Sequence, residues 1–238
     1  DPKRVYLDMP LILDAAHKLG ADALHPGYGF LAENGAFSAA VEEAGLAFVG
    51  PKAEQIAKLG DKLAGREAAQ KAGVPTVPGA QEPVADPKQA ARIAREIGFP
   101  VLIKASAGGG GRGMRVVRDE KELAEHIARA QSEAQAAFGD GRVFIEKYFE
   151  RVRHVEIQVL GDGHGQAVSL GERDCSVQRR HQKLIEESPS PGLTREAAAK
   201  MGQLAAKLAA SVQYRGAGTL EFLLPCGPEA KPGEFHFI

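Results

Sequence analysis

A glycine-rich segment between two β-rich runs restricts the fold of this chain more than any other feature. Val101 to Lys104 is a short apolar run that ends in a lysine, residues 108–113 hold five glycines interrupted once by arginine, and Met114 to Val117 is β-rich again. The pattern predicts a strand, a loop and a second strand. Glycine has no Cβ, so the N–H groups of such a loop can converge on an anion. We therefore expect a hairpin whose loop covers a phosphate chain.

Other glycine motifs fit this segment less well. Gly108, Gly110 and Gly113 match G-x-G-x-x-G, but a dinucleotide fingerprint needs a helix directly after it, and here a strand follows. A Walker loop is excluded because its lysine closes the loop, whereas Lys104 precedes it. The arrangement is nearer to the phosphate flap of protein kinases, with a strand lysine reaching the same phosphates. The alternative is a hairpin tip whose glycines only supply turn geometry.

Charge and composition exclude several classes of partner. The 238 residues include 30 basic and 31 acidic side chains, so no overall field favours nucleic acid or an anionic membrane. No apolar run is as long as a membrane span. Cys175 and Cys226 match no zinc spacing, which favours a reduced compartment. We expect the bacterial cytoplasm, or the mitochondrial matrix for a eukaryotic source, and, because the chain does not start with Met, a piece of a larger polypeptide.

The first 98 residues read as α/β units followed by helices. Asp8 and Asn34 are helix caps, and residues 21–25 and 46–49 are short strands. His25 and Tyr28 follow the first strand, where open α/β sheets place ligands, although a His-Pro-Gly turn is structural more often than not. Asp61 caps a further helix with Lys62 in its first turn. A cation there opposes the helix dipole, so Lys62 is either simply solvated or close to an anion.

The glycine hairpin has predicted supports on both sides in the sequence. Asp86 opens a helix that closes at Gly98. After the hairpin, one helix face is predicted to be buried, with Leu123, Ile127, Ala130, Ala134 and Ala137. Residues 143–149 are the next strand, with Glu146 and Lys147 at its end. Charged groups at a buried strand end need partners, so we expect them to contact the polar edge of a ligand.

Residues 151–238 predict an antiparallel sheet covered by one long helix, which starts at Thr194 and buries Met201, Leu204, Leu208 and Val212. Alternation places Val155, Ile157 and Val159 on one face of a strand and His154, Glu156 and Gln158 on the other.

Two features of this sheet point to anion and metal chemistry. A cationic run from Arg173 to Lys183, if extended, sends Arg179, His181 and Lys183 to one side, which suits phosphates or a small anion. The alternative is an exposed strand of ion pairs. Glu221 lies in an otherwise apolar strand, and a bound metal would offset the cost of burying its carboxylate. Together these features predict a site for a nucleoside triphosphate with Mg²⁺.

Several longer motifs resemble one family across essentially the whole chain. They are Lys104-Ala-Ser with the glycine run, Glu146-Lys-Tyr, Arg153-His-Val-Glu-Ile-Gln, Tyr214-Arg-Gly-Ala-Gly-Thr-Leu-Glu-Phe and the specific run Glu172-Arg-Asp-Cys-Ser-Val-Gln-Arg-Arg-His-Gln-Lys. They look like the biotin carboxylase component of biotin-dependent carboxylases, which has the ATP-grasp fold. The implied fold is α/β, becoming α+β in its second part. Residues 1–51 would be the end of the N-terminal (preATP-grasp) domain and 52–238 an incomplete ATP-grasp domain, with a lid at about 75–148.

The resemblance also implies an activity and its residues. Bicarbonate is activated by ATP, with Mg²⁺ or Mn²⁺, as carboxyphosphate, and CO₂ passes to biotin on a carrier domain. The implied ATP-binding residues are Lys62, Lys104, Gly108, Gly109, Gly110, Gly111, Gly113, Glu146, Lys147, Phe149, His154, Gln178, His181 and Leu223. The resemblance also implies that Lys183 and His181 lie near the reacting groups and that Glu221 is a metal ligand.

The implied partners are a biotin carboxyl carrier domain, a carboxyltransferase and a second copy of the protein. The family's second metal-binding glutamate, its asparagine, its bicarbonate-binding arginine and its general base have no counterpart in these residues, so we expect the 238-residue chain to bind nucleotide weakly and not to turn over. Two alternatives stay open. One is another ATP-grasp ligase, of the carbamoyl-phosphate or purine-pathway kind, and the other is a non-catalytic nucleotide-binding or assembly module.

Overall fold

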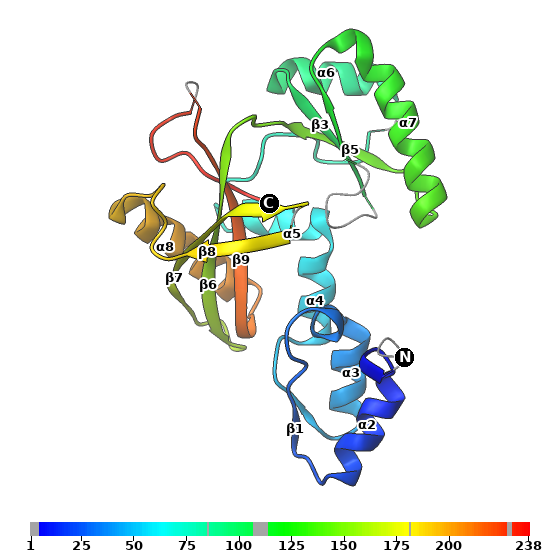
Figure 1. The fold of residues 1–238 in the computed structure, drawn as a ribbon, viewed down its shortest axis with the longest axis vertical. Coiled ribbons are helices and arrows are strands. Elements are labelled where there is room, and N and C mark those ends of the chain that lie inside the picture. The colour runs from blue at the N-terminus through cyan, green and yellow to red at the C-terminus, as the bar shows by residue number, and fades with distance from the viewer. Residues whose placement is uncertain (1–4, 85, 107–113, 181, 228–229) are drawn as a thin grey trace. The chain divides into compact units, whose positions relative to one another are not determined.

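The computed structural model describes residues 5–84, 86–106, 114–180, 182–227 and 230–238. The chain forms two compact units (Figure 1). The first comprises Asp1–Val74, Ile157–Glu172 and Arg195–Leu220, and the second comprises Pro75–Glu156, Arg173–Thr194 and Glu221–Ile238. Each unit therefore combines segments that are far apart in the sequence.

The N-terminal part of the first unit is α/β, as predicted. Its elements are α2 (Met9–Lys18), β1 (Ala23–Leu24), η1 (Phe30–Glu33), α3 (Gly35–Glu43), β2 (Ala47–Phe48), α4 (Ala53–Gly60) and α5 (Lys62–Lys71). The side chains of Asp8, Asn34 and Asp61 cap α2, α3 and α5 by accepting hydrogen bonds from backbone N–H groups. β1 and β2 pair in parallel, and Phe37 and Val41 of α3 are buried in the adjoining core.

Helix α8 (Arg195–Ser211) carries the predicted apolar face in the same unit. Met201 and Leu208 are buried, whereas Val212 lies beyond the end of the helix. A Cβ at Gly202 would come within 2.6 Å of the Ser169 hydroxyl, so glycine allows the helix to pack closely on the strand that carries Ser169.

The second unit contains the hairpin that the sequence predicts. β3 (Val101–Ala105) pairs antiparallel with β4 (Arg115–Val117) and with β5 (Val143–Lys147), in the order β4-β3-β5. Helices α6 (Pro87–Ile97) and α7 (Glu120–Phe138) lie beside this sheet (Figure 1). Their buried residues form one core with the strands: Ala90, Ala94, Leu123, Ile127, Ala130, Val101, Ile103, Val117, Val143 and Ile145.

One residue of the predicted helix face is placed differently. Ala137 is exposed, whereas Ala134 is buried. A helix of 19 residues is about 28 Å long, but strands of 5 residues span about 17 Å. The last turn of α7 therefore has no strand beneath it, and the prediction for Ala137 was wrong.

The C-terminal half forms a five-stranded sheet in the order β10-β9-β6-β7-β8. The strands are β6 (Val152–Asp162), β7 (Ala167–Arg179), β8 (Gln182–Glu187), β9 (Arg215–Pro225) and β10 (His236–Phe237). β7 pairs antiparallel with β8, and β9 with β10. Val155, Ile157 and Val159 are buried, as the alternation predicts.

The cationic run is not one extended strand, which corrects the prediction for Arg179 and Lys183. β7 ends at Arg179, Arg180 has a φ of 51°, and β8 returns so that Lys183 lies opposite Gln178. A reversal at Arg180 is hard to predict because positive φ usually selects glycine or asparagine. His181 lies outside the described residues.

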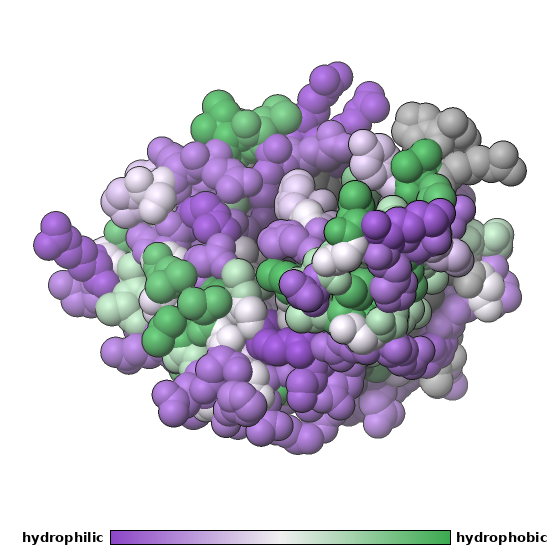
Figure 2. Space-filling model, turned by 90° about the horizontal axis from the view of Figure 1, so that it is seen from below, coloured by the Kyte–Doolittle hydropathy of each residue, from purple (hydrophilic) through white to green (hydrophobic). Residues whose placement is uncertain are grey.

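The surface seen in Figure 2 is largely polar, and its apolar side chains form separate groups. Leu19, Tyr28 and Phe30 are among the exposed apolar residues of the chain. Within the described ranges, every helix is too short or too polar to cross a bilayer.

Candidate nucleotide and anion site

Four neighbouring strands each contribute one charged side chain to a single cluster. Glu156 is on β6, Arg173 on β7, Lys183 on β8 and Glu221 on β9. The Lys183 ammonium lies 2.5 Å from Glu156 Oε2 and 2.6 Å from Glu221 Oε1. Arg173 donates to the other oxygen of Glu156, with its Nε 2.5 Å away. We call these four residues the four-strand cluster.

The charges of the four-strand cluster stabilise one another. Only 4% of the Glu156 side chain is exposed, and a buried carboxylate requires such partners. Burial disfavours the charged form of Lys183, but the hydrogen bonds with Glu156 and Glu221 outweigh it and raise the pKa of Lys183 above its ordinary value. Hydrogen bonds from His154 and then Lys183 lower the pKa of Glu221 to about 2. Glu221 is therefore a carboxylate, and Lys183 an ammonium, at neutral pH.

His154 extends the cluster along β6. Its Nε2 lies 3.5 Å from Glu221 Oε2, and its backbone N–H donates to the Ser176 hydroxyl at 3.1 Å. The other ring nitrogen, Nδ1, is buried and has no hydrogen-bond partner among the residues that the structure describes. A buried nitrogen without a partner is costly, so His154 can offer it to a ligand.

Gln178 is next to the cluster in the β7–β8 pairing, directly opposite Lys183. Its side-chain amide donates to the Cys175 carbonyl at 2.8 Å and is thereby held against its own strand. The amide oxygen of Gln178 can accept a hydrogen bond from a ligand.

A second, simpler pair lies on the three-stranded sheet. Lys104 of β3 and Glu146 of β5 approach to 2.5 Å between Nζ and Oε2, with 21% and 17% of their side chains exposed. We call this the two-strand pair. It places an ammonium directly before the glycine segment, as the sequence predicts, while Gly108, Gly109, Gly110, Gly111 and Gly113 lie outside the described residues.

Lys147 is used by the fold itself. Its ammonium donates to the carbonyl oxygens of Gly98 and Phe99, both at 3.0 Å, and its backbone N–H donates to the Pro78 carbonyl at 2.7 Å. The side chain therefore ties the end of β5 to the segment before β3. Lys147 can therefore contact a ligand through its backbone carbonyl.

Phe149 and Leu223 come together through a residue that the sequence did not single out. The Phe149 ring stacks on His236, with centroids 5.0 Å apart and planes 17° from parallel. His236 is directly opposite Leu223 in the β9–β10 pairing. The predicted base-binding residues therefore share one neighbour.

The sequence analysis also missed Glu156 as the shared partner of two cations. Glu156 alternates with His154 and Gln158 on one face, so its proximity to His154 was visible in the sequence. Nothing local showed that β7 and β8 would bring Arg173 and Lys183 to it. Of the remaining predicted residues, Lys62 begins α5 in the first unit, and its side chain is outside the description.

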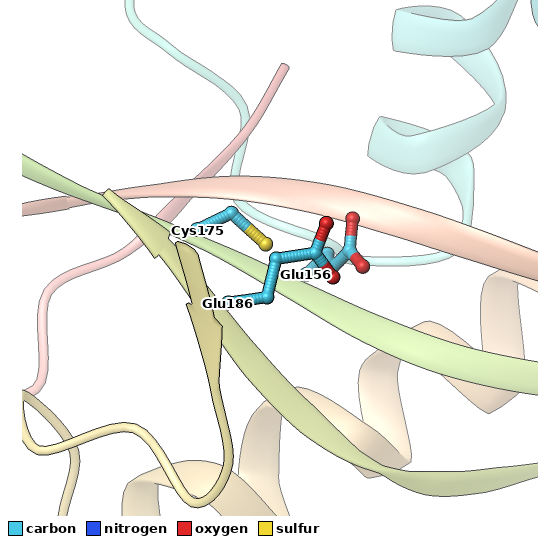
Figure 3. Close-up of side chains that lie close together, drawn as sticks. All are labelled: Glu156, Cys175 and Glu186. Carbon is cyan, nitrogen blue, oxygen red and sulfur yellow. The ribbon is translucent and has the colours of Figure 1, made fainter. Parts of the chain in front are cut away.

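One further group of ligand-type side chains touches the cluster (Figure 3). Glu156, Cys175 and Glu186 have potential ligand atoms within 4.8 Å of one another, the only such trio in the part of the chain that the structure describes. Burial, and then the charge of Glu156, raise the pKa of the Cys175 thiol to about 11, and both oxygens of Glu156 already accept hydrogen bonds from Arg173 and Lys183. The trio is therefore part of an ion-pair network rather than a metal site.

Comparison with known proteins assigns the chain at two levels. Residues 61–238 match the family described as carbamoyl-phosphate synthase L chain, ATP binding domain, and residues 1–56 match the biotin carboxylase N-terminal domain. The first match defines an ATP-grasp domain and the second distinguishes among its classes. The chain belongs to the biotin carboxylase family of the ATP-grasp superfamily.

Individual relatives agree over the whole chain. The biotin carboxylase of Haemophilus influenzae is 54% identical over 234 residues, which are 98% of this chain and 51% of that protein. A crystal structure of the Campylobacter jejuni biotin carboxylase in a β,γ-ATP complex has a TM-score of 0.88 and 46% identity, covering 99% of this chain and 52% of that one.

A third relative is the biotin carboxylase domain dimer of Hydrogenobacter thermophilus 2-oxoglutarate carboxylase, in complex with MgADP, ADP and bicarbonate. It has a TM-score of 0.86 and 49% identity, covering 98% of this chain and 50% of that one. The chain thus spans about half the length of the relatives that it matches.

Proposed function

We propose that this chain is part of an enzyme that carboxylates biotin with bicarbonate and ATP, the first half-reaction of a biotin-dependent carboxylase. The observation that carries the proposal is the four-strand cluster with His154. It combines an ionised carboxylate, an ammonium held between two carboxylates, and a histidine nitrogen that has no partner within the described ranges, all at one place on the sheet. The nucleotide and bicarbonate in the related crystal structures support the substrates.

Lys104 is the proposed phosphate-binding group of the two-strand pair. Its ammonium is paired with Glu146 and is still 21% exposed, so it can turn from the carboxylate to a phosphate oxygen at little cost. Gly108, Gly109, Gly110, Gly111 and Gly113 are the proposed lid, and Lys62, Gln178 and His181 further nucleotide contacts. Phe149 and Leu223 flank the base in this proposal, with the backbone at Glu146 and Lys147 reading its edge.

Lys183 is the proposed group for the bicarbonate, and His181 acts with it near the reacting groups. A bicarbonate oxygen attacks the γ-phosphorus of ATP, and the bond from that phosphorus to the β,γ-bridging oxygen breaks, giving carboxyphosphate and ADP. The C–O bond of carboxyphosphate then breaks, releasing CO₂ and phosphate. A ring nitrogen of biotin bonds to the carbon, and its proton passes to the released phosphate. An ammonium fixed between Glu156 and Glu221 stabilises anionic oxygens without having to reorganise.

Glu221 fits the Mg²⁺ that this reaction requires. A carboxylate with a pKa of about 2 is a hard, ionised oxygen donor, and Mg²⁺ commonly binds one or two carboxylates together with substrate phosphates and water. A bound ion, Mg²⁺ or Mn²⁺, would neutralise charge on the phosphates. Lys183 and His154 contact different oxygens of Glu221, so they hold the carboxylate in position and leave acceptor capacity on each oxygen for an ion.

The proposed partners follow from the two half-reactions. Biotin arrives on a carrier domain, a carboxyltransferase uses the carboxylated biotin, and a second copy of the enzyme completes a dimer. The dimer of the Hydrogenobacter domain and the pyruvate carboxylase subunits among the relatives support these partners.

The decisive experiment measures phosphate release from MgATP by the protein, with bicarbonate present and with free biotin absent or added. A rate that needs bicarbonate and rises with biotin is the expected result. A rate indifferent to biotin would favour another ATP-grasp ligase, and no rate with intact ATP binding would favour a binding module. The expectation that the 238 residues alone do not turn over stays a prediction, and the same assay on that chain tests it.

A further inference from the structure

His236 is a buried, polar ring that the proposed reaction does not use. It lies on β10, and only 11% of its side chain is exposed. Its Nδ1 is 3.2 Å from the Thr76 carbonyl, and its Nε2 is 3.0 Å from Glu234 Oε1. Three separate segments therefore fix the orientation of this ring: β10, the connection at residue 76 and the turn before β10.

The fixed ring lies against the predicted base-binding residues. It stacks on Phe149 with centroids 5.0 Å apart and an interplanar angle of 17°, and its backbone is paired with Leu223. Phe149 follows the end of β5 and is only partly buried, so its own strand does not fix its ring. Stacking on a neighbour that cannot rotate restricts the Phe149 ring to one plane.

We propose that His236 is a positioning residue for nucleotide binding: it fixes the plane of Phe149, and thereby sets the affinity for the adenine base but not for the phosphates. This inference rests on the proposed function, in which Phe149 and Leu223 flank the base. A ring that is already in place when the base binds loses no rotational freedom on binding, which favours affinity. The planar ring supplies this effect, while Thr76 and Glu234 set its angle.

The test compares two substitutions that separate the planar ring from its hydrogen bonds. His236→Leu keeps a buried apolar side chain but removes the plane, whereas His236→Phe keeps the plane and removes both hydrogen bonds. His164→Leu, at an exposed histidine in a turn, is the matched control. The dissociation constants of ATP and of inorganic tripolyphosphate are measured for each purified protein by calorimetry.

We expect His236→Leu to weaken ATP binding about fivefold, the effect of one aromatic pair, and to leave tripolyphosphate binding unchanged. His236→Phe keeps the planar ring but not the hydrogen bonds that set its angle, so it should bind ATP more tightly than His236→Leu and less tightly than the native protein. His164→Leu should bind both ligands like the native protein. Equal weakening for ATP and tripolyphosphate would mean that His236 only maintains the fold, and would overturn the inference. ATP binding that is unchanged in His236→Leu would also overturn it while leaving the proposed function intact, whereas a native protein that bound no ATP would refute both.

Discussion

The two charged groups of the site differ in how many strands build them. The two-strand pair joins Lys104 and Glu146, which lie on adjacent strands of one sheet, with Nζ and Oε2 2.5 Å apart. The four-strand cluster joins one residue from each of β6, β7, β8 and β9, and its central carboxylate, Glu156, is almost fully buried. The pair can exchange its partner for a ligand, whereas the cluster cannot lose a member without leaving a charge uncompensated.

The largest effect is expected from Lys183→Met, which removes the ammonium between Glu156 and Glu221. Removing one fixed donor to a developing anion commonly lowers turnover by about 100-fold or more. Bicarbonate-dependent phosphate release from MgATP measures the change. Lys71→Met is the control, because Lys71 is exposed and pairs with Glu67 on a helix that carries none of the cluster residues. Turnover in Lys183→Met within a few-fold of the native rate would show that the cluster is structural only.

A loss of stability is expected from Glu156→Gln. The substitution leaves Arg173 and Lys183 without the carboxylate that they share, and breaking a buried ion pair costs about 3 kcal/mol. Urea unfolding followed by circular dichroism measures the change in the free energy of unfolding. Glu67→Gln, at an exposed ion pair, should leave that free energy unchanged within error. If the two variants are equally stable, the cluster is no more interdependent than a surface pair.

The same contrast explains how much of the site the sequence could predict. The strand position of Lys104, the pairing of the two strands around the glycine segment and the helix caps at Asp61 and Asp86 follow from local patterns, and the structure confirms them. Local spacing is informative there because the interacting residues belong to one turn or to adjacent strands.

The four-strand cluster depends on pairing between distant strands, which no local pattern specifies. Glu156 was placed on the correct face, but its partners come from residues 17 and 27 positions away. His236 was visible only as part of a strand, because its contacts with Thr76 and Phe149 are equally remote. The reversal at Arg180 lacked the usual turn residues, so the extended interpretation of the cationic run was wrong. The domain boundary at 51/52 and the site roles stay predictions.

A smaller effect is expected from Lys104→Met in the two-strand pair. Losing one charge-assisted contact with a phosphate should weaken ATP binding about tenfold. Stability should fall less than in Glu156→Gln, because 17% of the Glu146 side chain is exposed, against 4% for Glu156. The dissociation constant of ATP and the urea midpoint are measured on the same samples. A large loss of stability with unchanged affinity would reverse the roles that we assign to the pair and the cluster.

The smallest effect is the contribution of Glu221, the outer member of the cluster, to the free energy of unfolding. The direction in which this contribution changes with pH follows from the pKa of Glu221. Folding lowers that pKa from 4.5 to about 2, through hydrogen bonds with His154 and Lys183, so the folded state binds the proton less readily than the unfolded state. The stability that Glu221 contributes is therefore fully present above about pH 4.5 and is lost as the pH falls toward 2. Because 39% of the side chain is exposed, solvent screening keeps this contribution below about 1 kcal/mol.

Glu221→Gln isolates this contribution from the other carboxylates of the chain. The difference in unfolding free energy between the native protein and Glu221→Gln should be constant from pH 7 to about 5. It should fall below about pH 4.5, where the unfolded side chain takes up a proton, and should approach zero only near pH 2, where the folded side chain becomes neutral as well. Urea unfolding at each pH measures it, with Glu82→Gln, at an exposed position outside the helices, as the control, whose difference should stay near zero throughout. A difference for Glu221→Gln that did not change with pH would mean that its carboxylate is not held by Lys183 and His154, and that the cluster effectively ends at Glu156.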